Sequence, residues 1–447
     1  MSARRVLWTS CLAQLLVVLD ISVVNVALPS MRLDLGLSST AVAWVALAYT
    51  LSFAGVLLVG ARLGDVLGPG RALWLGVAGF TLASLVGGIG SDGSVLIAVR
   101  VVQGLCAAVV SPATFTMLTV TFPEGPARVR AMATWTAMSL AGGGVGNLLG
   151  GALTQWLSWR AVFLIAVPLG LVVLAGAWRA AREATRGRGV RIEVVGAVLV
   201  TAAFCLATYT VSRLPAGISS PEWWIAGLLA VAVAGVAVAQ QRRAAHPLIP
   251  PRLWRNRSVT LGNAAIFVAG MCFQVSIWFF LTFLMQDHLG YRPAVTGLGF
   301  LPLTLTTLVV TAWIAPRVVE RCSPRSVAAV GAVVATVGLV IQGTLPLTSG
   351  WAVVIVLPSV IIGIGAGLFN TPLSVIVTSG VDAADAGAAS GLMNTAKQLG
   401  GAFGLALLTA TTVISPAGQT PFLLMAGLTL ITAVLITTTP AAARSHR

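Results

Sequence analysis

The chain has 447 residues, of which 57% are hydrophobic and only 9% charged, and its mean hydropathy is +0.96. This composition is that of a membrane protein and excludes an ordinary soluble domain. The formal net charge of +15 would suggest nucleic acid binding in a soluble protein. In a chain this apolar, the basic residues are better interpreted as signals of membrane topology, and no nucleic acid partner is expected.

Fourteen apolar segments follow one another along the chain, each long enough to cross the hydrocarbon core of a bilayer. We expect helices, because the backbone hydrogen bonds of a lipid-exposed segment must be closed within that segment. The segments cover, to within a few residues, 6–28, 41–61, 71–90, 94–119, 131–153, 160–178, 192–212, 222–241, 258–283, 294–315, 325–346, 351–377, 388–413 and 420–440. The sequence therefore predicts an all-α integral membrane protein.

The basic residues predict that both termini are cytoplasmic. If the N-terminus lies inside, 21 of the 27 basic residues fall in cytoplasmic segments, two fall within spans, and four fall in outside loops: Arg32, Arg160, Arg213 and Arg292. This is the bias of the positive-inside rule, and an even number of spans preserves it. The first span follows two arginines as a signal peptide would, but it contains Asp20, so we interpret it as an uncleaved helix.

Two arginine-rich polar segments, at 179–191 and 242–257, divide the spans into groups. They predict a six-helix bundle at 1–191, two inserted helices at 192–241, and a second six-helix bundle at 242–447. Such an arrangement has the internal symmetry that is common among transporters. No remaining segment is long enough to form a soluble domain.

Asp20 is the only acidic residue deep inside an apolar span. A carboxylate there costs roughly 2.5–3.5 kcal/mol on insertion scales, so a functional role is expected. Asp20 lies about 12 Å from the outer end of the first span and Arg100 about 9 Å from that of the fourth, at 1.5 Å per residue. The two side chains can therefore form a pair that protonation of Asp20 releases. The alternative is a static structural ion pair.

Two further features suggest moving parts. Asp65 lies at the cytoplasmic junction after the second span, where it would act as a conformational latch or simply cap the loop. Gly142, Gly146 and Gly150 have the spacing that lets two membrane helices approach closely.

Lys397 is the only lysine of the chain and lies well inside the thirteenth span, on one helical face with Asn394 and Gln398. A substrate or gating contact and a snorkelling or helix-pairing cation remain open as its role. Other candidates for a substrate cavity, each of which can instead serve packing, are Asn25, Trp44, Tyr49, Gln103, Gln274 and Trp278.

Several short motifs occur in a fixed order along nearly the whole chain. They are LDISVVNVALP at 19–29, WVALAY at 44–49, GDVLG at 64–68 followed by Arg71, RVVQG at 100–104, GGGVGNLLGG at 142–151, WRAVF at 159–163 and SGLMNTAKQLGG at 390–401. Each motif alone is weak, but the ordered set resembles the fourteen-span drug:proton antiporters of the major facilitator superfamily.

This resemblance implies a major facilitator fold with fourteen transmembrane helices arranged as 6 + 2 + 6, the two bundles enclosing a central cavity. It implies proton-coupling roles for Asp20 and Arg100, and gating roles for a second set: Asp65, Arg71, Gly142, Gly146, Gly150 and Gly151. Asn147 replaces the proline usual in that glycine motif, and Arg71 alone remains of several basic residues usual in the loop motif. A kink in the fifth span and a charge relay in the loop are therefore in question.

The resemblance predicts proton-coupled efflux of a small amphipathic drug or antibiotic across the bacterial cytoplasmic membrane. The proton would be the coupling ion, and no other cofactor is expected. In this mechanism Asp20 takes a proton from outside, which drives the return to the inward-facing state, and later releases it to the cytoplasm. Expected partners are a small-molecule substrate and membrane lipid, with a monomer as the default oligomeric state.

Other classes of function are less well supported. The three histidines have no metal-site spacing, the five cysteines are scattered singly, and no glycine-rich phosphate-binding loop ends in Lys-Ser or Lys-Thr. We therefore predict neither an enzyme nor a metal site. The alternatives kept open are a proton-coupled importer or lipid or metabolite carrier on the same fold, and a non-transporting membrane sensor.

Overall fold

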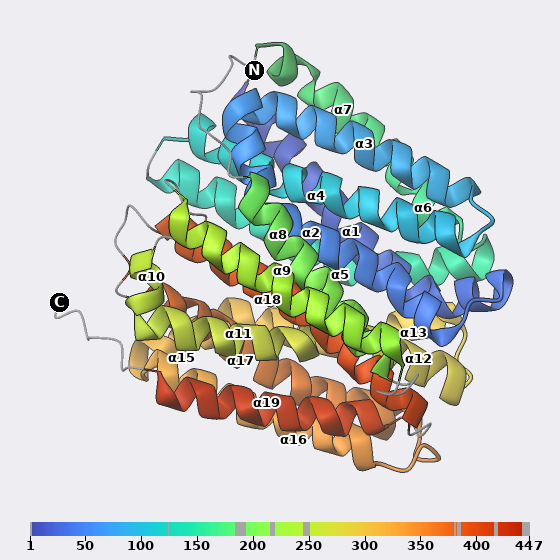
Figure 1. The fold of residues 1–447 in the computed structure, drawn as a ribbon. Coiled ribbons are helices and arrows are strands. Elements are labelled where there is room, and N and C mark those ends of the chain that lie inside the picture. Colours follow the sequence, from blue (N-terminus) through green and yellow to red (C-terminus); the bar gives the residue numbers. More distant parts are fainter. Residues whose placement is uncertain are drawn as a thin grey trace. The chain divides into compact units, whose positions relative to one another are not determined.

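In a computed structural model, the described part of the chain comprises residues 2–123, 125–183, 194–214, 220–244, 251–379, 381, 386–414 and 419–439. All regular secondary structure in these ranges is helical (Figure 1). Eleven helical stretches within them are long and apolar enough to cross a membrane. The prediction of an all-helical membrane protein is therefore confirmed.

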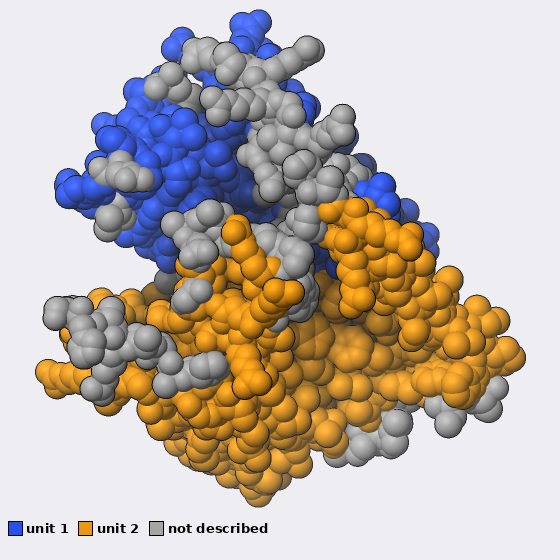
Figure 2. Space-filling view, turned by 60° about the vertical axis from the view of Figure 1, so that its left-hand side comes forward, with its two compact units in different colours: residues 1–201, 291–298 blue, residues 202–290, 299–447 orange. Residues whose placement is uncertain are grey.

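The chain divides into two compact units, residues 1–201 with 291–298 and residues 202–290 with 299–447 (Figure 2). The helices of the first unit are α1 (Ala3–Leu35), α2 (Ser39–Leu67), α3 (Pro69–Ile89), α4 (Gly93–Thr121), α5 (Pro126–Trp156), α6 (Ala161–Leu164), α7 (Ala166–Glu183) and most of α13 (Pro293–Gly299). The boundary between the units falls within α8 (Val194–Ser212).

Local sequence signals fix the ends of the first helices. Gly36 ends α1 in the left-handed conformation, with φ of 61°, and its N–H donates to the carbonyl of Arg32. The Ser38 side chain then caps α2 by accepting a hydrogen bond from the N–H of Ala41. Asp92 caps α4 in the same way, through the N–H of Ser94.

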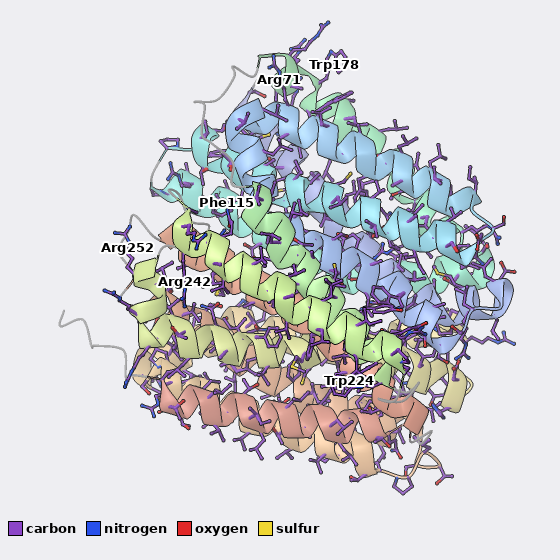
Figure 3. The ribbon with its side chains drawn as sticks, in the orientation of Figure 1. Arg71, Phe115, Trp178, Trp224, Arg242 and Arg252 are labelled. Atoms are coloured by element: carbon purple, nitrogen blue, oxygen red, sulfur yellow. The ribbon has the colours of Figure 1, made fainter. Side chains whose placement is uncertain are left out.

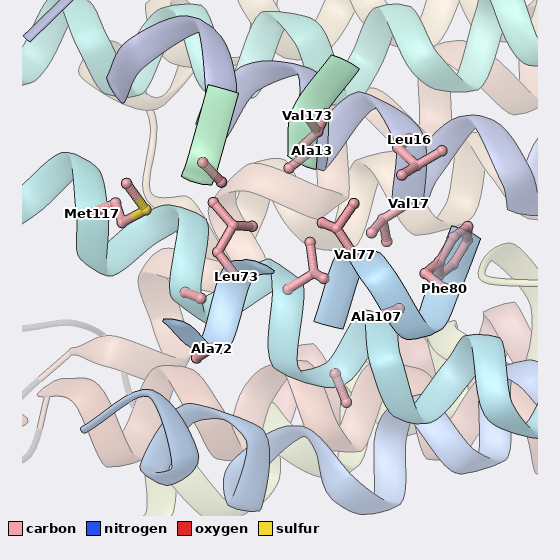
Figure 4. Packing of buried hydrophobic residues seen from close by; sticks show 14 of the residues in the cluster. Ala13, Leu16, Val17, Ala72, Leu73, Val77, Phe80, Ala107, Met117 and Val173 are labelled. Carbon is pink, nitrogen blue, oxygen red and sulfur yellow. The ribbon is translucent and has the colours of Figure 1, made fainter. Parts of the chain in front are cut away.

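The core of the first unit lies where α3 packs against α1, α4 and α7 (Figure 4). Leu73, Val77 and Phe80 of α3 are fully buried there. They contact a cluster that includes Leu16 from α1 and Ala107 from α4. This packing fixes α1 and α4 side by side, which sets the position of the polar residues that they carry.

The second unit contains the remaining helices. They are α9 (Pro221–Arg243), α10 (Pro251–Arg255), α11 (Arg257–Phe273), α12 (Ser276–Phe283), α14 (Leu301–Val309), α15 (Ala315–Arg321), α16 (Pro324–Thr344), α17 (Leu357–Thr378), α18 (Ala386–Ile414) and α19 (Thr420–Thr438). Three π-helical turns adjoin them: η2 (Leu284–His288), η3 (Val310–Ile314) and η4 (Ala352–Val356).

One membrane segment of the second unit is broken near its middle. Gln274 and Val275 separate α11 from α12 and are not helical, although no proline lies there. The Ser276 hydroxyl donates a 2.6 Å hydrogen bond to the carbonyl of Met271, which gives one freed backbone group a partner. Interruptions of this kind are frequent at functional sites in membrane helices.

The fifth span is not broken at Asn147, where the sequence left the presence of a kink open. Helix α5 runs without interruption through Asn147, whose side chain is buried. Replacement of the proline usual at this position therefore leaves a continuous helix.

Candidate functional site

Asp20 and Arg100, 80 residues apart in the chain, meet between α1 and α4. An Nη1 hydrogen of Arg100 is donated to Asp20 Oδ2, and the two side chains form an ion pair. Their exposed fractions are 0% for Asp20 and 2% for Arg100. The pair is therefore closed off from solvent. Its formation agrees with the similar depths in the membrane that the sequence predicted for the two residues.

Gln103, one turn after Arg100 on α4, completes the cluster. Its Nε2 donates to Asp20 Oδ1 at 3.0 Å and to the Ser84 hydroxyl at 2.9 Å. Its Oε1 accepts from Arg100 Nη1 at 2.9 Å. Both carboxylate oxygens of Asp20 thus accept a hydrogen bond from α4, and Gln103 contacts both members of the ion pair.

The guanidinium of Arg100 has further partners on α2. Its carbon Cζ lies 4.4 Å from the centre of the Tyr49 ring, a cation–π contact. Its Nε donates to the carbonyl of Val45 at 3.2 Å. The Tyr49 ring also stacks on Phe53, with centroids 6.1 Å apart. Three helices therefore hold the cation in one orientation.

The glycine stripe of α5 packs on the turn of α1 that carries Asp20. A Cβ atom added at Gly146 would lie 2.7 Å from Ser22 Cβ, and one at Gly150 would lie 2.7 Å from the carbonyl oxygen of Val23. At Gly142 the nearest atom would be Leu15 Cδ1, at 3.2 Å. Larger side chains at these positions would separate the two helices, so the stripe permits their close approach.

The next glycine of the motif, Gly151, contacts a segment from far along the chain. A Cβ atom there would clash with the backbone of Pro293 and Ala294. The N–H of Ala294 also donates to Gln155 Oε1 at 3.1 Å. Within the first unit, the segment 291–298 is therefore fixed to the last turns of α5.

The loop candidates lie at the α2–α3 junction. Asp65 is in the last turn of α2, but its side chain lies outside the described residues. Arg71, in the first turn of α3, donates from Nε to the carbonyl of Ala181 near the end of α7, at 3.1 Å. Figure 3 shows Arg71 and Trp178 at the same end of these two helices. Arg71 thus connects α3 to α7, and its gating role remains a prediction.

The substrate candidates are distributed over both units. In the first unit, Tyr49 and Gln103 are fully buried in the Asp20–Arg100 cluster, Asn25 is buried in α1, and Trp44 is half-buried in α2. In the second unit, Gln274 Nε2 donates to Gln398 Oε1 at 2.9 Å, which joins the α11–α12 break to α18. Roles in substrate binding remain predictions for all of these residues.

The other three candidates belong to the second unit. The Trp278 ring lies 5.4 Å from that of Phe300. Lys397 is half-buried and Asn394 is exposed, both on α18.

Two features of the cluster were not predicted from the sequence. Ser84 is a buried hydroxyl that accepts from Gln103 and donates to the carbonyl of Phe80 at 2.8 Å. Nothing distinguishes it in the sequence from the other serines of the spans. Tyr49 was considered as a substrate contact or a packing residue, whereas its ring contacts Arg100. The aromatic residue was visible in the sequence, but its cationic partner was not.

The described residues contain no group of three or more histidine, cysteine, aspartate or glutamate side chains placed to hold a metal ion. The expectation that the protein uses no metal stays a prediction.

The sequence and fold match known transporters. A profile of the Major Facilitator Superfamily matches residues 10–405. The cephamycin export protein of Amycolatopsis lactamdurans is 45% identical over 99% of this chain and 94% of its own. The puromycin resistance protein of Streptomyces alboniger is 36% identical over 89% of this chain and 79% of its own.

A solved peptide transporter in complex with sulfate has the same fold, with a TM-score of 0.72 at 15% identity, over 97% of this chain and 94% of its own. The chain therefore belongs to the major facilitator superfamily. It is a multi-pass membrane transporter and not an enzyme.

Proposed function

We propose that the protein is a proton-coupled antiporter that exports small amphipathic drugs or antibiotics from the cytoplasm. Two relatives, a cephamycin export protein and a puromycin resistance protein, support export of an antibiotic. The alternatives on the same fold, an importer or a lipid or metabolite carrier, have no comparable support among these two relatives.

The buried pair of Asp20 and Arg100 carries the proposal of proton coupling. While Asp20 is ionised, its two oxygens hold Arg100 and Gln103 on α4. Protonation removes the charge and with it the main attraction between α1 and α4 at this depth. Arg100 then keeps the carbonyl of Val45, the Tyr49 ring and Gln103 Oε1 as partners. One proton thus changes which helices the cation joins.

Helix α5 would convert this change into movement. Its glycine stripe contacts α1 at Leu15, Ser22 and Val23, on both sides of Asp20. A shift of α1 relative to α4 would therefore change the contacts between α1 and the glycine stripe of α5. In the proposed cycle Asp20 takes a proton from outside, the transporter returns to its inward-facing state, and the proton leaves to the cytoplasm.

We further propose fourteen transmembrane helices in a 6 + 2 + 6 arrangement, with both termini on the cytoplasmic side of the bacterial inner membrane. The arginine distribution supports this topology. A C-terminal fusion to green fluorescent protein, which becomes fluorescent only in the cytoplasm, tests it. Bright cells are expected, and a dark full-length fusion would place the C-terminus outside the cytoplasm and reject this topology.

The function is tested by ethidium efflux from cells that lack their own major efflux pumps. The wild type should expel ethidium, a protonophore should stop it, and Asp20→Asn should abolish it at equal membrane expression. The matched control is Asp34→Asn, because Asp34 also pairs with an arginine, Arg160, but at exposed positions. That variant should resemble the wild type, since exposed pairs contribute little.

Each outcome of this experiment has a definite meaning. Efflux that persists in Asp20→Asn would reduce the buried pair to a structural role. Efflux that ignores the protonophore would reject proton coupling. If the wild type expels no ethidium, the same assay with puromycin and with a cephamycin decides between a narrow exporter and no export at all.

A further inference from the structure

Lys397 is a cation with no counter-charge among the described residues. The described ion pairs are Arg100–Asp20, Arg160–Asp34 and Arg213–Glu222, and none involves Lys397. Among the described residues, its ammonium group also has no hydrogen bond and no aromatic ring within cation–π distance. An ammonium carries three donors, and a membrane interior makes each unmet donor costly.

Snorkelling to the membrane surface does not explain this lysine. Lys397 lies eleven residues after the start of α18 at Ala386 and seventeen before its end at Ile414. At 1.5 Å per residue these are about 16 Å and about 25 Å, well beyond the reach of a lysine side chain. The charge therefore stays at depth within the unit.

The acidic residues of the second unit are all elsewhere. In its described part they are Glu222 in the first turn of α9, Asp287 in η2 and Glu320 next to the end of α15. All three are at ends of membrane segments. The other two, Asp382 and Asp385, lie outside the described residues, before α18 in the chain.

The part of α18 that carries Lys397 packs on the broken helix, where two glutamine side chains meet. Gly401, one turn further along the same face of α18, packs against this break: a Cβ there would lie 2.8 Å from Gln274 Cβ and 3.3 Å from Val275 Cγ2. Gln274 in turn donates to Gln398 Oε1 at 2.9 Å. That bond uses the acceptor of Gln398, so its amide N–H groups remain as donors next to the cation in the sequence.

We propose that Lys397, with the amide of Gln398, recognises a single carboxylate on the transported compound. This deepens the export function proposed above and rests on it. One ammonium matches the charge of one carboxylate, and the N–H donors of Gln398 suit its oxygens. The bound substrate would then supply the counter-charge that the described residues lack. The structure thus assigns to this transporter a preference for monoanionic amphipathic substrates over their neutral analogues.

The test compares two probes that differ only in this group: cefoxitin, a cephamycin with a free carboxylate, and its neutral methyl ester. Equilibrium dialysis with the purified full-length protein measures both dissociation constants. A charge-assisted contact predicts that the wild type binds the acid about tenfold or more tightly than the ester. In Lys397→Gln this ratio should fall close to one, and in Lys397→Arg much of it should remain.

The matched control is Arg317→Gln, which removes one positive charge from an exposed position of α15 and should leave the ratio unchanged. Equal binding of acid and ester by the wild type would overturn the proposal, as would an unchanged ratio in Lys397→Gln. The ratio does not depend on the fraction of correctly folded protein, so a poorly folding variant remains informative.

Uptake of the two probes into inside-out vesicles separates this proposal from the export function. Carboxylate-selective binding without proton-driven uptake would reject the exporter and keep the anion site. Proton-driven uptake of both probes at equal rates, with no effect of Lys397→Gln, would keep the exporter and reject the anion site.

Discussion

In the first unit, the buried arginine is enclosed by a carboxylate, a glutamine, a backbone carbonyl and an aromatic ring. In the second, the half-buried lysine has none of these partners among the described residues. The helices of the two units also differ, in how often they are interrupted. Apart from the α6–α7 junction, the helices of the first unit run unbroken, whereas the second has the α11–α12 break and three π-helical turns.

This difference separates two ways of using charge in a membrane. The Asp20–Arg100 cluster is complete in itself, so only a change in its own protonation alters it. Lys397 has no partner among the described residues, so in our proposal a group of the substrate binds to satisfy it. The contrast supports our two proposals, that the coupling proton binds in the first unit and that the second unit recognises the substrate.

The largest expected effect comes from breaking the complete cluster. Arg100→Met leaves Asp20 as a buried charge without its partner, which should destabilise the protein by about 3–5 kcal/mol. The apparent melting temperature of the purified variant in detergent, followed by size-exclusion chromatography, should fall far below that of the wild type.

The double variant Asp20→Asn, Arg100→Met removes both charges and provides the control. It should recover a large part of the lost stability, because no unpaired charge remains. If Arg100→Met alone melts at the same temperature as the wild type, the pair contributes nothing to the stability of the fold. The contrast between the two units is then lost.

A smaller effect is expected where α5 supports the cluster. Gly150→Val places methyl groups against the backbone of Val23, and overpacking of this kind typically costs about 1–3 kcal/mol. Gly143→Val is the matched control on the same helix, because the nearest atom to a Cβ there is Ser22 Oγ, at 4.0 Å.

Ethidium efflux and the melting temperature, measured on both glycine variants, check this prediction. Only Gly150→Val should lose efflux. If both variants lose efflux equally, the close packing of Gly150 on α1 does not explain why this helix needs glycine.

The smallest expected effect on the melting temperature is an increase, not a decrease. Lys397→Met removes a cation that has no partner among the described residues, so the melting temperature of the protein without substrate should stay the same or rise, by the equivalent of about 1 kcal/mol. A clear fall would mean that Lys397 already has a counter-charge within the protein, which would remove the contrast between the units.

Much of this architecture follows from the sequence. Apolar segment length predicted the helices, and a lone acid in the first span with an arginine at matching depth in the fourth pointed to the Asp20–Arg100 pair. The spacing of Gly142, Gly146 and Gly150 indicated a close helix contact, and these residues pack on α1. These signals are local, so one sequence carries them.

The remainder depends on how the helices are rotated about their axes. A membrane helix is apolar on most faces, so its hydropathy pattern does not tell which side faces a neighbour. For this reason Ser84 and the ring of Tyr49 were not recognised as partners of Gln103 and Arg100. The break at Gln274 was equally hidden, since no proline marks it.

Because Lys397 is the only lysine, its side chain is also the only primary amine in the protein apart from the N-terminus. An amine-selective fluorescent reagent therefore labels one defined side chain of the native protein, without any engineered cysteine. Reagents that cannot cross the bilayer, applied from one face or the other, then report the side to which this residue is open. The transport cycle can thus be followed in the unaltered polypeptide.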